Sequence, residues 1–265
     1  MFSAHATGHV IGVFHDEGYG YDVFGLHPPT LERMVSLGAP IYDRYFRVSS
    51  HGVEQIPHDG PTILVANHGG VLPVDAAMLC LDVLRKLEPP RIPRALADHF
   101  VPRLPIVSTL FARCGVVSGA RTNAAHLLER GELVVLWPEG VSGPAKRFRD
   151  RYQIQDWRVG FAELAIRHRA AIVPVAIVGA EESWPLVTKL GAHVFGAPYL
   201  PIPAWPLPLP THYQIQYGAP VDVTRETIAD DADDPAIVAE LAARVRRSVE
   251  HLIQDLRLAR RGVFR

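Results

Sequence analysis

The sequence predicts an α/β fold with a mostly parallel central sheet flanked by helices and a long helix near the C-terminal end. Two observations predict it. Short, continuously apolar runs bounded by turn residues are typical of strands covered on both faces. These runs alternate with segments whose apolar residues recur every three or four positions, as in amphipathic helices. The expected strands are 46–48, 63–66, 92–97, 115–117, 132–136, 171–178 and 213–217, and the expected helices are 31–37, 75–87, 99–111, 123–130, 159–169 and 235–261.

Local signals set the ends of these elements. Pro89 and Pro90 close the helix before them, and two further prolines break the segment 99–111. Gly131 ends the helix that precedes the strand 132–136. The acidic run 230–234 favours a helix start, because carboxylates stabilise a helix N-terminus. The last helix carries its apolar residues on one face and ends in arginines, which suit a helix C-terminus.

The chain is expected to divide into an N-terminal helical or irregular segment (1–45), a central domain (46–225) and a C-terminal amphipathic helix packed on it (226–265). Residues 1–29 show no periodicity, and the sequence assigns them no role. The apolar segment 194–210 contains six prolines, which exclude a helix or a central strand, so irregular chain is expected there.

Composition excludes some classes of protein. The 265 residues are 48% hydrophobic and 21% charged, with a net charge of −1, so there is no basic excess for binding nucleic acid. Two cysteines form no disulfide framework, which favours a reducing cytoplasm. No signal peptide and no apolar run of about 20 residues is seen, so an enzyme acting on lipid would lie on a membrane and not through it.

A histidine and an aspartate follow the apolar strand 63–66. His68 stands in a turn with two glycines, and Asp75 precedes a helix. Neutral imidazole can accept a proton from a hydroxyl that attacks a carbonyl, and a carboxylate on its other nitrogen fixes the tautomer. No serine or cysteine nucleophile is adjacent, which suggests that the hydroxyl belongs to the substrate. The alternative is that His68 caps a strand and Asp75 caps a helix.

Further polar residues also follow strands. Glu139 and Gly140 come after the strand 132–136, in an apparent corner that exposes the carboxylate. Arg121 follows the strand 115–117, and arginine makes bidentate contacts to phosphate. Lys146 and Arg147 begin a basic cluster beyond the corner. The alternatives are a solvated glutamate, a surface arginine and a solvated charged face.

Together these sites resemble, in order and spacing, the lysophosphatidic acid acyltransferase (PlsC-like) family of glycerolipid acyltransferases. The resemblance covers about residues 46–220 and four blocks. The blocks are Asn-His followed by Asp (67, 68 and 75), Gly and Arg six positions apart (115 and 121), aromatic-Pro-Glu-Gly (137–140) and an apolar strand with an embedded proline (172–177).

The resemblance implies a glycerolipid acyltransferase-like fold, with 46–225 as the acyltransferase domain. It implies that His68 deprotonates a hydroxyl of a lysophospholipid or other glycerolipid, which attacks the thioester of acyl-CoA or acyl-carrier protein while Asp75 orients His68. No metal and no bound cofactor are expected. The expected location is cytoplasmic, peripheral to the inner face of the cell membrane. The residues implied in substrate binding are Asn67, Arg121, Glu139, Gly140, Lys146 and Arg147.

Two departures from the family pattern leave alternatives open. Six residues separate His68 from Asp75, where the family usually has four. After the third block the family often continues with a hydroxyl residue and then arginine, and here Val141-Ser142-Gly143 intervenes. The phosphate-binding role then passes to Lys146 or Arg147. One alternative is a lipid- or acyl-chain-binding protein that keeps the fold without catalysis, and a weaker one is a hydrolase. The sequence leaves open the acceptor headgroup, the acyl chain length, the choice of donor and the oligomeric state.

Overall fold

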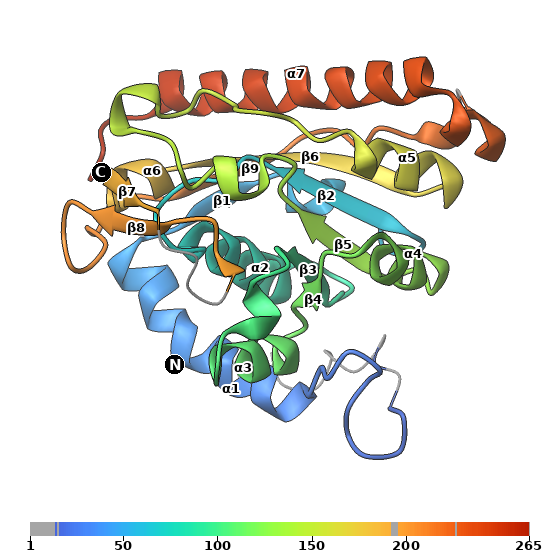
Figure 1. The fold of residues 1–265 in the computed structure, drawn as a ribbon, viewed down its shortest axis with the longest axis horizontal. Coiled ribbons are helices and arrows are strands. Elements are labelled where there is room, and N and C mark those ends of the chain that lie inside the picture. The colour runs from blue at the N-terminus through green and yellow to red at the C-terminus, as the bar shows by residue number, and fades with distance from the viewer. Residues whose placement is uncertain (1–13, 15, 192–195, 226, 265) are drawn as a thin grey trace.

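The computed structural model describes residues 14, 16–191, 196–225 and 227–264 (Figure 1). Its main sheet contains β1 (Ser49–His51), β2 (Thr62–Ala66), β3 (Pro93–Ala97), β4 (Val117–Ser118), β5 (Leu133–Leu136), β6 (Ala171–Val178) and β9 (Gln214–Tyr217). The strands β7 (Leu186–Leu190) and β8 (Leu200–Pro203) form a separate hairpin. The helices are α1 (Pro28–Pro40), α2 (Val74–Lys86), α3 (Val107–Arg113), α4 (Arg121–Glu129), α5 (Gly160–Arg167), α6 (Ala180–Ser183) and α7 (Pro235–Ala259).

The sheet is mostly parallel, which confirms the predicted fold class. Its strand order is β1-β9-β6-β2-β5-β3-β4. All neighbours are parallel except β6 and β9, which run antiparallel. Figure 1 shows α5 and α7 on one side of the sheet and α1, α2 and α3 on the other. The sheet is therefore the middle layer of three.

Strand β2 lies at the centre of this arrangement and is buried on both faces. Ile63 and Val65 pack with α4, α5 and α7, while Leu64 and Ala66 pack with α2. All four residues have zero exposure. Alternate residues of a strand point to opposite faces, so a strand between two helical layers must be apolar throughout.

The proline in β6 costs the sheet no hydrogen bond to β2. Pro174 lies opposite Val65 in the parallel register, and its carbonyl accepts a hydrogen bond from Gly218 N. The nitrogen and carbonyl of one strand residue point to the same side, so the missing N–H faces the β9 side. The paired register with β9 begins only at Val175, one residue later.

The prediction of a strand at 46–48 is wrong. A π-helix, Ile41–Tyr45, ends at Phe46, and the strand β1 begins three residues later. Tyr42 and Phe46 are both buried in the core beneath the sheet. Their helical spacing puts both rings on one face, so packing favoured a helix over the extended form that the aromatic residues suggested.

The proline-rich segment is also more regular than predicted. Residues 200–203 form β8, which pairs antiparallel with β7, with Lys189 opposite Pro201. A two-stranded hairpin has only edge strands, where a proline need not donate to a neighbour. The remainder, from 204 to 210, contains no helix or strand, and 192–195 fall outside the described residues.

The C-terminal helix α7 is the amphipathic helix that the sequence predicts. Asp234 caps it by accepting a hydrogen bond from Ala236 N at 2.8 Å. Its apolar face is buried against α5 and β6, including Val245 and Val249 at zero exposure. That face is therefore part of the core. Among the described residues, no helix combines the length and apolarity needed to cross a bilayer.

Candidate active site

Three polar residues lie beyond the C-terminal ends of neighbouring strands. His68 follows β2, Glu139 follows β5 and Glu181 follows β6. Because β5, β2 and β6 are adjacent and parallel, these ends meet at one edge of the sheet. The crevice beyond the carboxyl ends of the strands is where open α/β sheets bind ligands.

Asn67 ties this edge together from within. Its side-chain Nδ2 donates to the carbonyl of Ile177 at 2.9 Å, and its Oδ1 accepts from Ile177 N at 2.8 Å. Asn67 is buried, so its amide is occupied by β6 and not by a substrate. The contact anchors the chain one residue before His68 to the neighbouring strand.

The structure brings His68 and Asp75 into direct contact. His68 Nδ1 lies 2.7 Å from Asp75 Oδ2, which also accepts from Gly69 N at 3.0 Å. Asp75 Oδ1 accepts from Ala76 N at 2.8 Å. The six-residue spacing is spanned by a turn in which Gly70 has a φ of +89°, a conformation that favours glycine. The longer spacing therefore does not separate the two side chains.

This contact sets the state of the imidazole. An ionised Asp75 requires a proton on Nδ1, which leaves Nε2 as the basic nitrogen. No described residue hydrogen-bonds Nε2, and 13% of the His68 side chain is exposed. Burial lowers the pKa of His68. The charge and hydrogen bond of Asp75, together with the charge of Glu139, raise the pKa by more than burial lowers it, so it lies above its usual 6.5.

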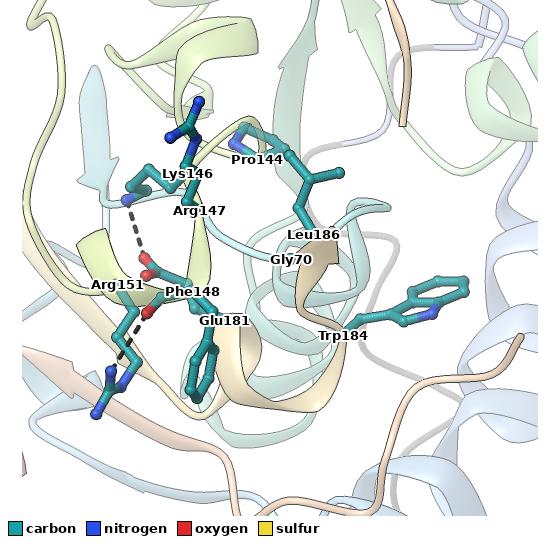
Figure 2. Close-up of a pocket in the computed structure, with 10 residues that line it drawn as sticks. Gly70, Pro144, Lys146, Arg147, Phe148, Arg151, Glu181, Trp184 and Leu186 are labelled. Atoms are coloured by element: carbon teal, nitrogen blue, oxygen red, sulfur yellow. Dashed lines mark hydrogen bonds and ion pairs between the residues drawn. The ribbon is translucent and has the colours of Figure 1, made fainter. Parts of the chain in front are cut away.

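Glu139 is buried, and the predicted exposed corner is wrong. Its Oε1 accepts from His68 N at 3.0 Å and its Oε2 from Gln155 N at 2.8 Å. Lys146 Nζ lies 3.1 Å from Glu139 Oε2 and 2.9 Å from Glu181 Oε1. Figure 2 shows the Lys146 ammonium directed at the Glu181 carboxylate. The ammonium predicted to hold a headgroup phosphate is instead bound between two protein carboxylates.

Ionisation in this buried cluster depends on the pairing. Burial would lower the pKa of Lys146, but the charges of Glu181 and Glu139 raise it, so the ammonium stays protonated. Burial raises the pKa of Glu181, and the nearby Lys146 opposes that effect. The Lys146 ammonium therefore depends on the two carboxylates beside it.

Three predicted residues lie outside this cluster. Arg121 is the first residue of α4 and forms an ion pair with Glu163 of α5. Gly140 has a φ of +51°, and a Cβ there would lie 3.0 Å from the Arg158 guanidinium carbon. Both the backbone conformation and the limited space therefore favour glycine at this position. Arg147 has an exposed side chain, while its backbone bridges to Leu186 of β7.

A groove of about 730 Å³ lies beside the cluster, between the chain after β5 and the β7–β8 hairpin. Its lining includes Lys146, Arg147, Val187 and Tyr199. Tyr199 Oη donates to the carbonyl of Val141 at 2.9 Å, which joins the two walls. The hairpin wall was not predicted: β8 lies in the segment 194–210 that was expected to be irregular, and the sequence analysis assigned no element to the residues of β7.

Glu181 was missed by sequence reasoning, although a signal was present. It follows the apolar strand β6 after a glycine, as His68 and Glu139 follow theirs. The same rule about polar residues beyond strand ends would have selected it. Among the described residues, no group of three histidines, cysteines or carboxylates is arranged to hold a metal ion.

Comparisons with known proteins identify the relatives of this chain. The profile of the Acyltransferase family matches residues 47–178. An uncharacterized protein of Mycobacterium tuberculosis is 40% identical over 258 residues, which cover 93% of this chain and 72% of that protein. A human protein named DGAT1/2-independent enzyme synthesizing storage lipids is 28% identical over 210 residues, covering 77% of this chain and 60% of that protein.

A solved structure shares the fold. The crystal structure of the 1-acyl-sn-glycerophosphate (LPA) acyltransferase PlsC from Thermotoga maritima matches with a TM-score of 0.59 at 19% identity, covering 88% of this chain and 81% of that one. The four blocks that suggested the family all lie within the matched profile. The chain therefore belongs to the Acyltransferase family and has the fold of a PlsC-like glycerolipid acyltransferase.

Proposed function

We propose that the protein transfers an acyl group from a thioester, acyl-CoA or acyl-carrier protein, to a hydroxyl of a glycerolipid. His68 Nε2 takes the hydroxyl proton as the oxygen attacks the thioester carbonyl carbon. The carbon–sulfur bond then breaks, and the imidazolium returns the proton to the leaving thiolate. Asp75 holds the tautomer and stabilises the imidazolium. The observation that carries the proposal is the 2.7 Å contact between His68 Nδ1 and Asp75, with Nε2 left open.

The experiment measures acyl transfer and thiol release together. Purified protein is given one radiolabelled acyl thioester and a panel of lysophospholipids and neutral glycerides in vesicles. We expect the wild type to form labelled product and free thiol in equal amounts. The His68→Ala variant should form neither, and its thermal unfolding midpoint should equal that of the wild type. Turnover by that variant would contradict the general-base role. Binding without thiol release would support a lipid-binding protein, and thiol release without acceptor would support a hydrolase.

The acceptor is either a lysophospholipid or a neutral glyceride, and two observations favour testing the second. Arg121 and Lys146 already pair with protein carboxylates, and the human relative is named for synthesizing storage lipids. Arg147 is the remaining predicted cation and lines the groove. If the acceptor carries a phosphate, Arg147→Gln should raise its KM more than it lowers kcat, whereas the KM of a neutral glyceride should not change.

We further propose that the protein works at a membrane surface, on the side that carries the π-helix and the proline-rich segment. Tyr45 Oη donates to the carbonyl of Pro208 at 2.6 Å, which joins the two. Ile41 and Leu207 beside them are 46% and 71% exposed. Interfacial binding scales with apolar area, so Ile41→Glu with Leu207→Glu should reduce vesicle flotation. Unchanged flotation would refute this surface. The apolar face of α7 is buried and is not part of it.

A further inference from the structure

Three buried charged side chains form a network that contacts the backbone of His68 but not the nitrogens of its imidazole ring. Glu139 accepts from His68 N, and Lys146 joins Glu139 to Glu181. The side chains of Lys146, Glu139 and Glu181 are 3%, 0% and 6% exposed. Their polar atoms face one another and the protein backbone. Lys146 borders the groove, but its ammonium is bound between the two carboxylates, so a role in direct contact with a lipid acceptor does not suit Lys146 or Glu139.

The loop that carries His68 is also closely packed on two sides. A Cβ on Gly69 would lie 2.3 Å from Glu181 Cγ, and a Cβ on Gly143 would lie 2.7 Å from His68 Cβ. The Glu181 carboxylate is itself held, because its Oε2 accepts from Tyr152 N at 2.6 Å. The His68 loop thus lies between Glu181 and the turn at Gly143, and a displaced carboxylate would displace the loop.

We infer that Lys146, itself held by Glu181, is a positioning residue that pairs with the buried Glu139 carboxylate and so holds His68 at its distance from Asp75. The inference rests on the proposed function and reassigns Lys146 from substrate binding to the His68 loop. Both oxygens of Glu139 accept from backbone N–H groups, which suits a carboxylate because it carries no proton that would compete with those donors. A buried carboxylate keeps its charge only when it is paired, and Lys146 is the cation that pairs it.

Removal of Lys146 has a defined consequence. Glu139 and Glu181 would then face each other without a cation, and one of them would bind a proton. A protonated Glu139 loses an acceptor for His68 N or for Gln155 N, and the His68 loop moves. Because the change affects the geometry of a base and not a substrate contact, it lowers kcat and leaves KM unchanged.

The test is a set of variants assayed for kcat and for the KM of each substrate. Lys146→Met should lower kcat about 10- to 100-fold, with both KM values within about twofold. Lys146→Met combined with Glu181→Gln should recover at least about threefold of that loss, because only one buried carboxylate remains. Lys86→Met is the matched control: Lys86 pairs with the buried Asp82 at 3.0 Å on the other end of α2. Its kinetic constants should be unchanged.

A spectroscopic readout separates this inference from the proposed reaction. The downfield NMR signal of the His68 Nδ1 proton reports the bond to Asp75 directly. It should be present in the wild type, weakened in Lys146→Met and intact in Lys86→Met. If the wild type transfers no acyl group to any acceptor, the proposed function fails. The Nδ1 proton signal would still test whether Lys146 positions His68, because it does not depend on activity.

Three results would overturn the inference. One is a raised acceptor KM with unchanged kcat in Lys146→Met, which would make Lys146 a substrate ligand. A second is a double variant no more active than the single one. The third is an unchanged Nδ1 proton signal. If Lys146→Met does not fold, Lys146→Gln, which removes the charge but keeps a hydrogen-bond donor, must lower kcat without changing KM, and equal kcat would refute the role.

Discussion

Replacement of Asp75 by asparagine tests the proposed chemistry most directly. Asp75 accepts three hydrogen bonds, from His68 Nδ1 at 2.7 Å, Gly69 N at 3.0 Å and Ala76 N at 2.8 Å. An asparagine has one acceptor oxygen and one NH₂ group, so in either orientation a donor faces a donor. With the oxygen toward Ala76 N, the NH₂ group faces Nδ1 and drives the proton to Nε2, which removes the base.

The size of the effect follows from these contacts. Loss of general-base catalysis costs about 10²- to 10⁴-fold in kcat, or about 3–5 kcal/mol of transition-state stabilisation. Asp75 has zero exposure and cannot touch a substrate, so KM should stay within about twofold. The assay is the steady-state rate of labelled acyl transfer at saturating donor and acceptor.

A matched control exists on the same helix. Asp82 is also fully buried in α2 and accepts hydrogen bonds from Tyr42, Ser50 and Tyr217, away from His68. Asp82→Asn should lower the thermal unfolding midpoint and leave kcat unchanged when measured below that midpoint. The reasoning is refuted if Asp75→Asn keeps more than a tenth of the wild-type kcat, or if Asp82→Asn loses as much activity as Asp75→Asn.

Three further outcomes are expected. Because His68 acts as a base and its pKa is raised, kcat/KM should fall as the pH drops through a value above 6.5, and a limb below 6.5 in the pH–rate profile would contradict the pKa direction. Asn67→Ala leaves the N–H and C=O of Ile177 without their partners, which should cost about 2–4 kcal/mol in chemical denaturation, and a loss under about 0.5 kcal/mol would contradict it. Gly143→Ala places a Cβ 2.7 Å from His68 Cβ and 2.9 Å from His68 O, so kcat should fall while KM holds, and wild-type kcat would show that the loop has room to move.

The sequence alone determined the framework of the site. A strand buried on both faces has to be apolar along its whole length, so β2, β5 and β6 were recognisable as continuous runs. Parallel strands end at one edge, so His68 and Glu139 could be placed near each other without coordinates. The 71 positions between His68 and Glu139 do not prevent this inference, because it depends only on the direction of the strands that precede them.

Only the tertiary structure decided which charges are free. Lys146 stands in a basic run that looks solvated, yet it is buried between Glu139 and a glutamate on a different element. Arg121 pairs with Glu163, and Asn67 with a backbone 110 residues away. Each of these contacts joins segments that only sheet formation brings together. No local pattern records such a partner, because the energy of a buried charge depends on what the rest of the chain places beside it.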